Sequence, residues 1–157
     1  MAQRRIPFFF MRGGTSRGPY FNAADLPDDR DDIAKILLEV IGAGHPLNID
    51  GIGGGNAVTN KVAILSQSNT EESDIDYLFA QVSVTEQLVD FKPTCGNILS
   101  GVGPVAIEMG LMPASDLATD VRIKLINTGA LVVARVQTPN GVVRYDGDTK
   151  IDGVPAT

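Results

Sequence analysis

The single cysteine of this 157-residue chain lies in the segment Thr94-Cys95-Gly96-Asn97, directly before a long apolar run. That run, residues 98–111, predicts a helix that begins beside the cysteine. A thiol at a helix N-terminus lies among unpaired backbone N–H groups, which favour the thiolate, the reactive form of cysteine. Cys95 is therefore the first candidate for chemistry, and the alternative is a small buried hydrophobic residue.

Polar groups beside glycine form a second set of candidates. The N–H groups of Gly96 and Asn97, together with the Asn97 amide, suit a bound carboxylate, although Asn97 is also a good helix N-cap. The loop 53–56, which ends at Asn56, has three glycines that allow the backbone to approach a substrate closely. No Gly-Lys-Ser/Thr follows it, so it is not a P-loop, and a plain connector is the alternative.

The glycine-rich turn 12–18 carries hydroxyl and cationic groups. Its Thr15, Ser16 and Arg17 offer two hydroxyls and a guanidinium fork to a carboxylate, unless the segment is an ordinary turn. The chain as a whole is acidic, with a formal net charge of −6 and no basic face of the kind that binds nucleic acid. Local cations in an acidic protein indicate a small anionic substrate.

Composition limits the remaining possibilities. No apolar run approaches the roughly 20 residues of a membrane span, so we expect no membrane insertion. One cysteine cannot form an internal disulfide, which fits a reducing, cytoplasmic location. The single histidine, His45, leaves no His/Cys cluster for a metal, and we expect neither a metal nor a cofactor.

Hydrophobic patterns predict the elements that position these residues. A helix opens at residues 26–29, buries one face over residues 33–41 and ends at Gly42. The predicted strands cover residues 5–11, 19–22, 61–65, 75–84, 88–90, 121–127, 131–137 and 142–145, with the last three forming a meander. The fold class is therefore α+β, with mostly antiparallel strands.

The predicted helix 98–111 is apolar nearly all round, because Glu108 is its one charged residue. Such a helix is buried on all sides. Gly101 and Gly103 are tolerated there if strands pack closely, and Pro104 is expected to kink the helix. We therefore expect an antiparallel sheet or barrel wrapped around a central buried helix, with Cys95 at its exposed mouth.

Several segments resemble the 2-methylaconitate isomerase family, and within it the 4-oxalomesaconate tautomerase branch. They cover nearly the whole chain: Met11-Arg12-Gly13-Gly14-Thr15-Ser16-Arg17-Gly18, Asp50-Gly51-Ile52-Gly53-Gly54-Gly55-Asn56, Thr59-Asn60-Lys61-Val62-Ala63, Asp76-Tyr77-Leu78-Phe79-Ala80-Gln81-Val82, Cys95-Gly96-Asn97, Asn127-Thr128-Gly129 and Ile151-Asp152-Gly153-Val154-Pro155.

The resemblance implies a diaminopimelate-epimerase-like fold, with two pseudo-symmetric halves and the active site between them. Residues 1–157 are then expected to form a single domain equal to the N-terminal half, and the second half is absent. The implied reaction is a cofactor-independent proton shift that moves a double bond in an unsaturated di- or tricarboxylate. The best single substrate is 4-oxalomesaconate, and the alternative is 2-methylaconitate or aconitate.

By the same resemblance, Cys95 and Lys61 are the expected acid and base, in an order left open. Without the resemblance, Lys61 is a solvated lysine at the start of a strand. A hypothesis of another class is a truncated, non-catalytic domain that binds carboxylates or self-associates as a homodimer through an exposed apolar face.

Overall fold

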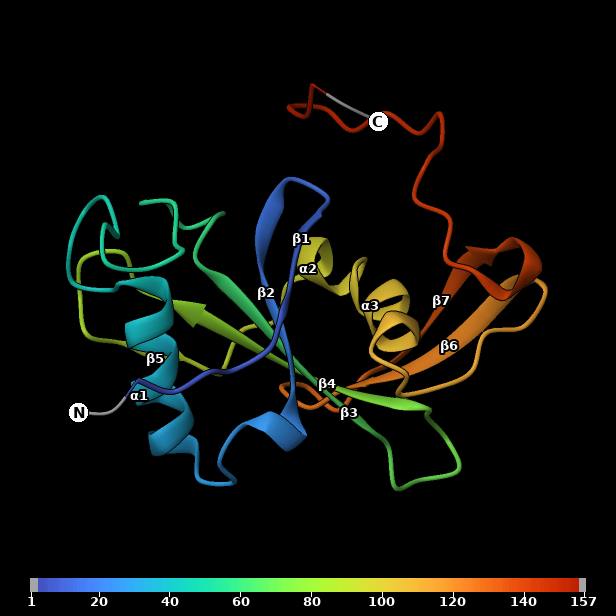
Figure 1. The fold of residues 1–157 in the computed structure, drawn as a ribbon, viewed down its shortest axis with the longest axis horizontal. Coiled ribbons are helices and arrows are strands. Elements are labelled where there is room, and N and C mark those ends of the chain that lie inside the picture. Colours follow the sequence, from blue (N-terminus) through green and yellow to red (C-terminus); the bar gives the residue numbers. More distant parts are fainter. Residues whose placement is uncertain (1–2, 156–157) are drawn as a thin grey trace.

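Figure 1 shows a computed structural model of the chain, which describes residues 3–155. Its strands and short helices confirm the predicted α+β class. In chain order the elements are β1 (Phe9–Gly13), β2 (Ser16–Asn22), the 3-10 helix η1 (Ala23–Asp25), α1 (Arg30–Ile41), β3 (Lys61–Gln67), β4 (Ile75–Val82), β5 (Val89–Asp90), α2 (Gly96–Leu99), α3 (Val102–Glu108), β6 (Leu117–Leu125), β7 (Leu131–Thr138) and the 3-10 helix η2 (Pro139–Gly141).

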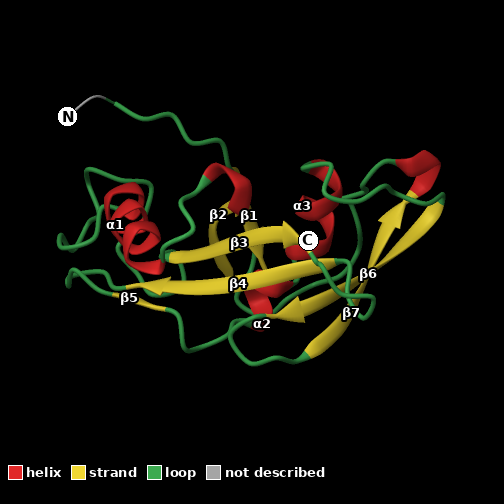
Figure 2. Ribbon diagram, turned by 90° about the horizontal axis from the view of Figure 1, so that it is seen from below, coloured by secondary structure: helices red, strands yellow, loops and turns green. Residues whose placement is uncertain are grey.

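Within the described range the strands form one curled, mixed sheet of order β1-β2-β3-β4-β6-β7, and β5 pairs with β4 (Figure 2). Most neighbours are antiparallel, but β2 pairs with β3 and β4 with β6 in parallel. Parallel neighbours need crossover connections, which are almost always right-handed. Because β2 and β4 run in opposite directions, their two crossovers place helices on opposite faces of the sheet.

Helix α1 accordingly covers one face of the sheet, and α2 and α3 cover the other. Alternating side chains of β3 show the division: Val62 and Ile64 pack in the core around α1, whereas Ala63 and Leu65 pack in the core around α2 and α3. The face toward which Ala63 and Leu65 point is called the α2 face below. Cys95 packs against the core on this face.

The structure of α1 confirms the prediction for this region. The Asp29 side chain accepts hydrogen bonds from the N–H groups of Asp31 and Asp32, at 3.0 and 3.1 Å, and so caps the helix. Gly42 ends it in the left-handed conformation, with φ of 77°. The helix buries Ile33, Leu37 and Ile41.

The predicted single helix 98–111 is instead two short helices, α2 and α3, so this part of the prediction is wrong. They are separated at Ser100 and Gly101. The side chain of Tyr20 lies against this break and explains the glycine there, because a Cβ on Gly101 would collide with its phenolic oxygen. Pro104 does not kink α3, since it lies in the first turn, where its missing N–H needs no partner.

The predicted third strand of the meander, residues 142–145, is also wrong. After η2 the chain leaves the sheet as an irregular segment (Figure 1). The η2 turn, in which Asn140 has φ of 58°, does not return the chain alongside β7. Of the four residues only Val143 is buried, and a bond from the Arg144 N–H to the Gln137 carbonyl, at 2.9 Å, ties the segment to β7.

The start of the chain also differs from the prediction. The first strand begins at Phe9 rather than at residue 5, and its turn into β2 is only two residues long, Gly14 and Thr15. Between residues 3 and 155 no helix has the length and apolar character needed to cross a membrane. The expected cytoplasmic location stays a prediction.

Candidate active site

Cys95 immediately precedes α2 as its N-cap residue, in extended conformation. Its carbonyl accepts the first helical hydrogen bond, from the Leu99 N–H at 2.9 Å, but its side chain makes no capping bond. The thiol is therefore partly buried at the position that was predicted and is not used to cap the helix. As the first residues of α2, Gly96 and Asn97 have N–H groups without intrahelical acceptors.

Asn97 joins the start of α2 to the β1–β2 turn. Its Nδ2 donates a hydrogen bond of 2.9 Å to Thr15 Oγ1, so the alternative that Asn97 caps the helix is wrong. The turn approaches so closely that a Cβ on Gly13 or Gly14 would collide with Asn97 oxygens. The structure thus brings together the predicted residues Thr15, Asn97 and, next to it in the helix, Gly96.

Two tyrosines that were not predicted from the sequence donate hydrogen bonds to the backbone around Cys95. Tyr20 Oη donates to the Ile98 carbonyl at 2.7 Å, and Tyr77 Oη donates to the Cys95 carbonyl at 3.5 Å. Burial raises the pKa of both phenols far above the ordinary value, and negative charge on Cys95 contributes a smaller increase. Both phenols therefore stay neutral hydrogen-bond donors. A tyrosine in an apolar strand needs a partner for its hydroxyl, and this signal could have identified them.

Lys61 is the first residue of β3, half-buried, and lies in register for the α2 face with Ala63. Its Nζ donates to Gln81 Oε1 at 2.7 Å and lies 5.3 Å from the centroid of the Phe79 ring. Lys61 is therefore not a freely solvated lysine. It shares a face with Cys95, although no hydrogen bond joins the two side chains among the contacts of residues 3–155.

The remaining predicted residues lie apart from Cys95 or are enclosed. Ser16 alternates toward the α2 face with Tyr20, but it is 2% exposed and its Oγ has no hydrogen-bond partner in the described part of the chain. Arg17 alternates to the opposite face, where its guanidinium lies 5.5 Å from the centroid of the Phe10 ring. Asn56 uses its Oδ1 to accept from the Val58 N–H at 3.1 Å.

Arg17 and Asn56 nevertheless belong to one local structure. The Arg17 N–H donates to the Val58 carbonyl at 3.0 Å, and a Cβ on Gly54 would approach the Arg17 guanidinium within 2.8 Å. The glycine loop therefore packs on the start of β2. The structure brings together Cys95, Gly96, Asn97 and Thr15, places Lys61 on the same face, and leaves Arg17 and Asn56 in a second group.

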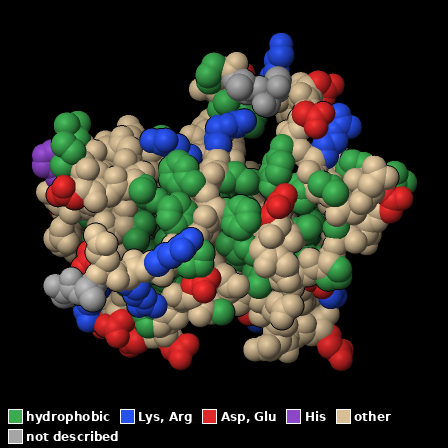
Figure 3. All heavy atoms as spheres, viewed as in Figure 1, with side chains coloured by type: hydrophobic (Ala, Val, Ile, Leu, Met, Phe, Trp, Pro, Cys, Tyr) green, Lys and Arg blue, Asp and Glu red, His purple; other side chains and the backbone are tan. Residues whose placement is uncertain are grey.

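Figure 3 shows the surface over this region, in the orientation of Figure 1. Hydrophobic side chains gather over β1, α2 and α3, and lysine and arginine side chains lie among them. In residues 3–155, no group of three or more His, Cys, Asp or Glu side chains is arranged to hold a metal ion. The chemistry that this chain's own residues offer on the α2 face is proton transfer by a thiol and an amine, beside backbone and amide donors for an anion.

Comparisons with known proteins agree with the motif resemblance. A solved structure described as methylitaconate-delta-isomerase superposes with a TM-score of 0.93 at 43% identity, covering 98% of this chain and 69% of that one. The 4-oxalomesaconate tautomerase of Pseudomonas putida is 53% identical over 155 residues, and the (4E)-oxalomesaconate Delta-isomerase of a Novosphingobium strain is 52% identical over 151 residues.

These two alignments cover 99% and 96% of this chain, but only 43% and 42% of the relatives. The chain thus spans less than half the length of the curated relatives that it matches. A family model described as "PrpF protein" matches residues 3–157. Because that match includes nearly every residue, the chain belongs to the PrpF protein family.

Proposed function

We propose that this chain is the N-terminal half of a cofactor-independent isomerase that moves a proton and a double bond in an unsaturated di- or tricarboxylate. The observation that carries the proposal is the position of Cys95. Cys95 immediately precedes α2, two residues before the Asn97 that bonds Thr15, and it packs on the same sheet face as Lys61. The names of the relatives support the same reaction class, with 4-oxalomesaconate as the preferred substrate.

The reaction conserves every atom of the substrate. A base removes a proton from a carbon next to a conjugated carbonyl or carboxylate, and the electron pair of that C–H bond enters the conjugated system as a dienolate. An acid then protonates another position, so the double bond migrates. Forming the negative charge on the dienolate oxygen accounts for most of the activation barrier. Hydrogen-bond donors directed at that oxygen therefore lower the barrier most.

Cys95 and Lys61 are the two groups of this chain that we assign to the proton transfers. The N–H groups of Gly96 and Asn97 and the Thr15 hydroxyl are the donors assigned to a substrate carboxylate. Arg17 and Asn56, which lie in the second group, are assigned to the glycine loop rather than to the substrate, and the enclosed Ser16 is given no separate role. A second, pseudo-symmetric half, as in the epimerase-like fold, would supply the opposite wall of the cleft.

Substitution of the thiol tests this proposal. In the complete gene product, Cys95→Ser keeps the size of the side chain but removes the titratable thiol, and we expect about a hundredfold or greater loss of kcat. Lys61→Met tests the amine, with Lys35→Met as its control, since Lys35 is exposed and pairs with Asp32 far from α2. The rate is followed by the ultraviolet absorbance of the diene. Near-normal turnover by Cys95→Ser would contradict the assignment.

A second candidate function, a self-associating carboxylate-binding domain, is favoured by the two sheet edges. Phe9 and Phe10 of β1 and Leu131 and Val133 of β7 are exposed, and Val133 is 64% exposed. Unpaired edges with apolar side chains favour association with another chain. Sedimentation gives the mass in solution, and calorimetric titration with trans-aconitate gives binding. Binding by a dimer without turnover supports this second function over catalysis.

A further inference from the structure

The side-chain amide of Gln81 in β4 bonds the Lys61 ammonium group and two backbone carbonyls, and the proposed reaction gives Gln81 no role. Its Oε1 accepts from Lys61 Nζ at 2.7 Å, and its Nε2 lies 3.1 Å from both the Ala57 and the Asn60 carbonyl oxygens. We propose that Gln81 is a positioning residue, which holds the Lys61 amine on the α2 face and fixes it to the loop 57–60. This inference rests on the proposed function for the role of Lys61 in proton transfer.

Hydrogen-bond chemistry fixes the orientation of the Gln81 amide. An amide has an acceptor oxygen and a donor NH2 group, whereas an ammonium group is a donor only and carbonyls are acceptors only. If the amide were reversed, its NH2 would face the donor Lys61 and its oxygen would face the carbonyls of Ala57 and Asn60. Because those two carbonyls hold the NH2 group, the oxygen of Gln81 must point at Lys61.

Strand register and an aromatic ring also help to fix the position of the Lys61 ammonium group. Lys61 and Gln81 are directly opposite each other in the antiparallel β3–β4 pair. Phe79, two residues earlier in β4, presents its ring to the ammonium group, and a ring face attracts a cation. The ammonium group therefore has an oxygen acceptor and an aromatic face in fixed places, instead of the freedom of a surface lysine.

The same amide connects Lys61 to the glycine loop. Asn60, whose carbonyl accepts from Gln81, also accepts a hydrogen bond at its Oδ1 from the Gly54 N–H at 3.2 Å. Asn60 is fully buried, so this connection is held from within. The Lys61 amine is thus joined to the glycine loop through Gln81 and Asn60.

The contact itself can be tested without an activity assay. The chain has five lysines, so the ammonium signals of a ¹⁵N-lysine-labelled sample are few, and Lys61→Arg assigns the Lys61 signal. We expect Lys61 ammonium protons to exchange with water about tenfold more slowly than those of Lys92 or Lys150, and Gln81→Met to abolish the difference. Gln67→Met is the control, because Gln67 donates to the Leu111 carbonyl at the other end of β3. Equal exchange in the unmodified protein and in Gln81→Met would overturn the proposal.

A double-mutant cycle separates positioning from a structural role. In the complete gene product, Gln81→Met is expected to lower kcat about tenfold to a hundredfold with KM nearly unchanged, since small misplacements of a reacting group have effects of that size. In a Lys61→Met background it should cause little further loss. A full additional loss there would show that Gln81 acts independently of Lys61 and would contradict the positioning role. If Lys61→Met is itself fully active, the role proposed for Lys61 fails, while the exchange measurement still decides the Gln81 contact.

Discussion

At the scale of single residues, the phenols of Tyr20 and Tyr77 act on the backbone that carries Cys95 rather than on its thiol. Both hydroxyls donate to carbonyls of the first turn of α2, those of Ile98 and Cys95. A buried hydroxyl without a hydrogen-bond partner costs free energy, so these bonds hold the start of α2 against β2 and β4. Cys95 is thus positioned by two strands that lie far from it in sequence.

The same tyrosines predict how stability depends on pH. Burial, followed by negative charge on Cys95, raises the pKa of Tyr20 and Tyr77 above the ordinary value of 10.0. When folding raises the pKa of a group, its contribution to folding stability is complete at pH values below its pKa in the unfolded chain. That contribution is lost as the pH rises above this pKa toward the pKa in the folded protein. Above about pH 10, the free energy of unfolding should therefore fall by about 1.4 kcal/mol per pH unit for each tyrosine.

Urea denaturation between about pH 9 and about pH 11 measures this slope, and Tyr77→Phe is expected to remove about half of it. Tyr145→Phe is the control, because Tyr145 is 57% exposed and should retain most of the slope. An identical slope in Tyr77→Phe and the unmodified protein would show that Tyr77 is not shielded as the structure describes.

How far single residues can be predicted from sequence depends on the separation of their partners. The position of Cys95 before a helix was predictable because both features are local. The partner of Asn97 is Thr15, 82 residues away, and that of Lys61 is Gln81, 20 residues away. Neighbouring residues alone suggested that Asn97 caps the helix, whereas in the structure its side chain bonds the distant Thr15.

At the scale of elements, the break between α2 and α3 lies at a close approach between Gly101 and Tyr20. Gly101 lies against the ring of Tyr20, whose hydroxyl bonds the Ile98 carbonyl at the end of α2. Sequence periodicity reports which face of a helix is apolar, but it cannot show that a bulky side chain from another strand fills the space beside one glycine. The apolar run therefore predicted burial correctly and continuity wrongly.

Gly101→Ala tests how tightly Gly101 packs against Tyr20. The added methyl group would collide with the Tyr20 phenol, and we expect a loss of about 1–3 kcal/mol in the free energy of unfolding, measured by chemical denaturation. Gly96→Ala, at the start of α2, is the matched control, because no atom lies within 4 Å of its added Cβ. It should be neutral or stabilising by about 0.5 kcal/mol. Equal losses in both variants would contradict the packing argument.

At the scale of the whole molecule, the β6–β7 hairpin is joined to the rest of the sheet by a short parallel pairing. Only three residue pairs form the β4–β6 register, from Ile75↔Ile123 to Tyr77↔Leu125. The general rule of right-handed crossovers predicts which faces the helices cover, whereas the parallel pairings themselves were not evident from the strand patterns. Contacts beside this junction therefore matter for the integrity of the sheet.

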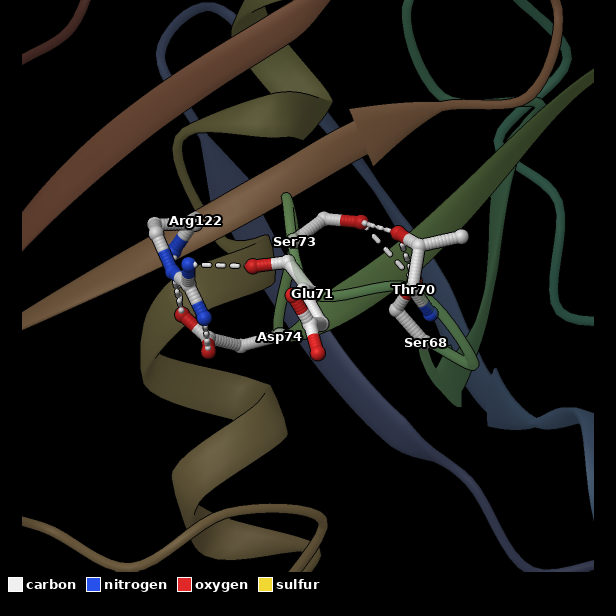
Figure 4. Close-up of polar contacts among 6 residues, drawn as sticks. All are labelled: Ser68, Thr70, Glu71, Ser73, Asp74 and Arg122. Atoms are coloured by element: carbon white, nitrogen blue, oxygen red, sulfur yellow. Dashed lines mark hydrogen bonds and ion pairs between the residues drawn. The ribbon is translucent and has the colours of Figure 1, made fainter.

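Figure 4 shows such a contact next to the junction. Asp74, just before β4, accepts from the Arg122 guanidinium at 2.6 and 3.1 Å and from the Arg122 N–H at 2.9 Å, and Arg122 also donates to the Glu71 carbonyl. These hydrogen bonds lower the pKa of Asp74 below its ordinary value, so the carboxylate stays charged at neutral pH. Hydroxyls of Ser68, Thr70 and Ser73 hold the same loop together (Figure 4).

We expect Asp74→Ala to loosen the β6–β7 hairpin, because it removes three hydrogen bonds that join this hairpin to the β3–β4 connection. The predicted loss is about 1 kcal/mol, a modest value because the Arg122 side chain is 47% exposed and solvent screens the pair. In native-state hydrogen exchange, Asp74→Ala should accelerate exchange in β6 and β7, relative to the unmodified protein, more than it does in β3.

The matched control is Asp120→Ala. Asp120 also binds an arginine through two hydrogen bonds, but its partner Arg135 lies in β7 of the same hairpin, and both side chains are exposed. Its loss should leave the β4–β6 junction and the exchange of β6 and β7 nearly unchanged. If both substitutions accelerate exchange equally, the Asp74–Arg122 pair is an ordinary surface ion pair and the parallel strands hold the two parts of the sheet together unaided.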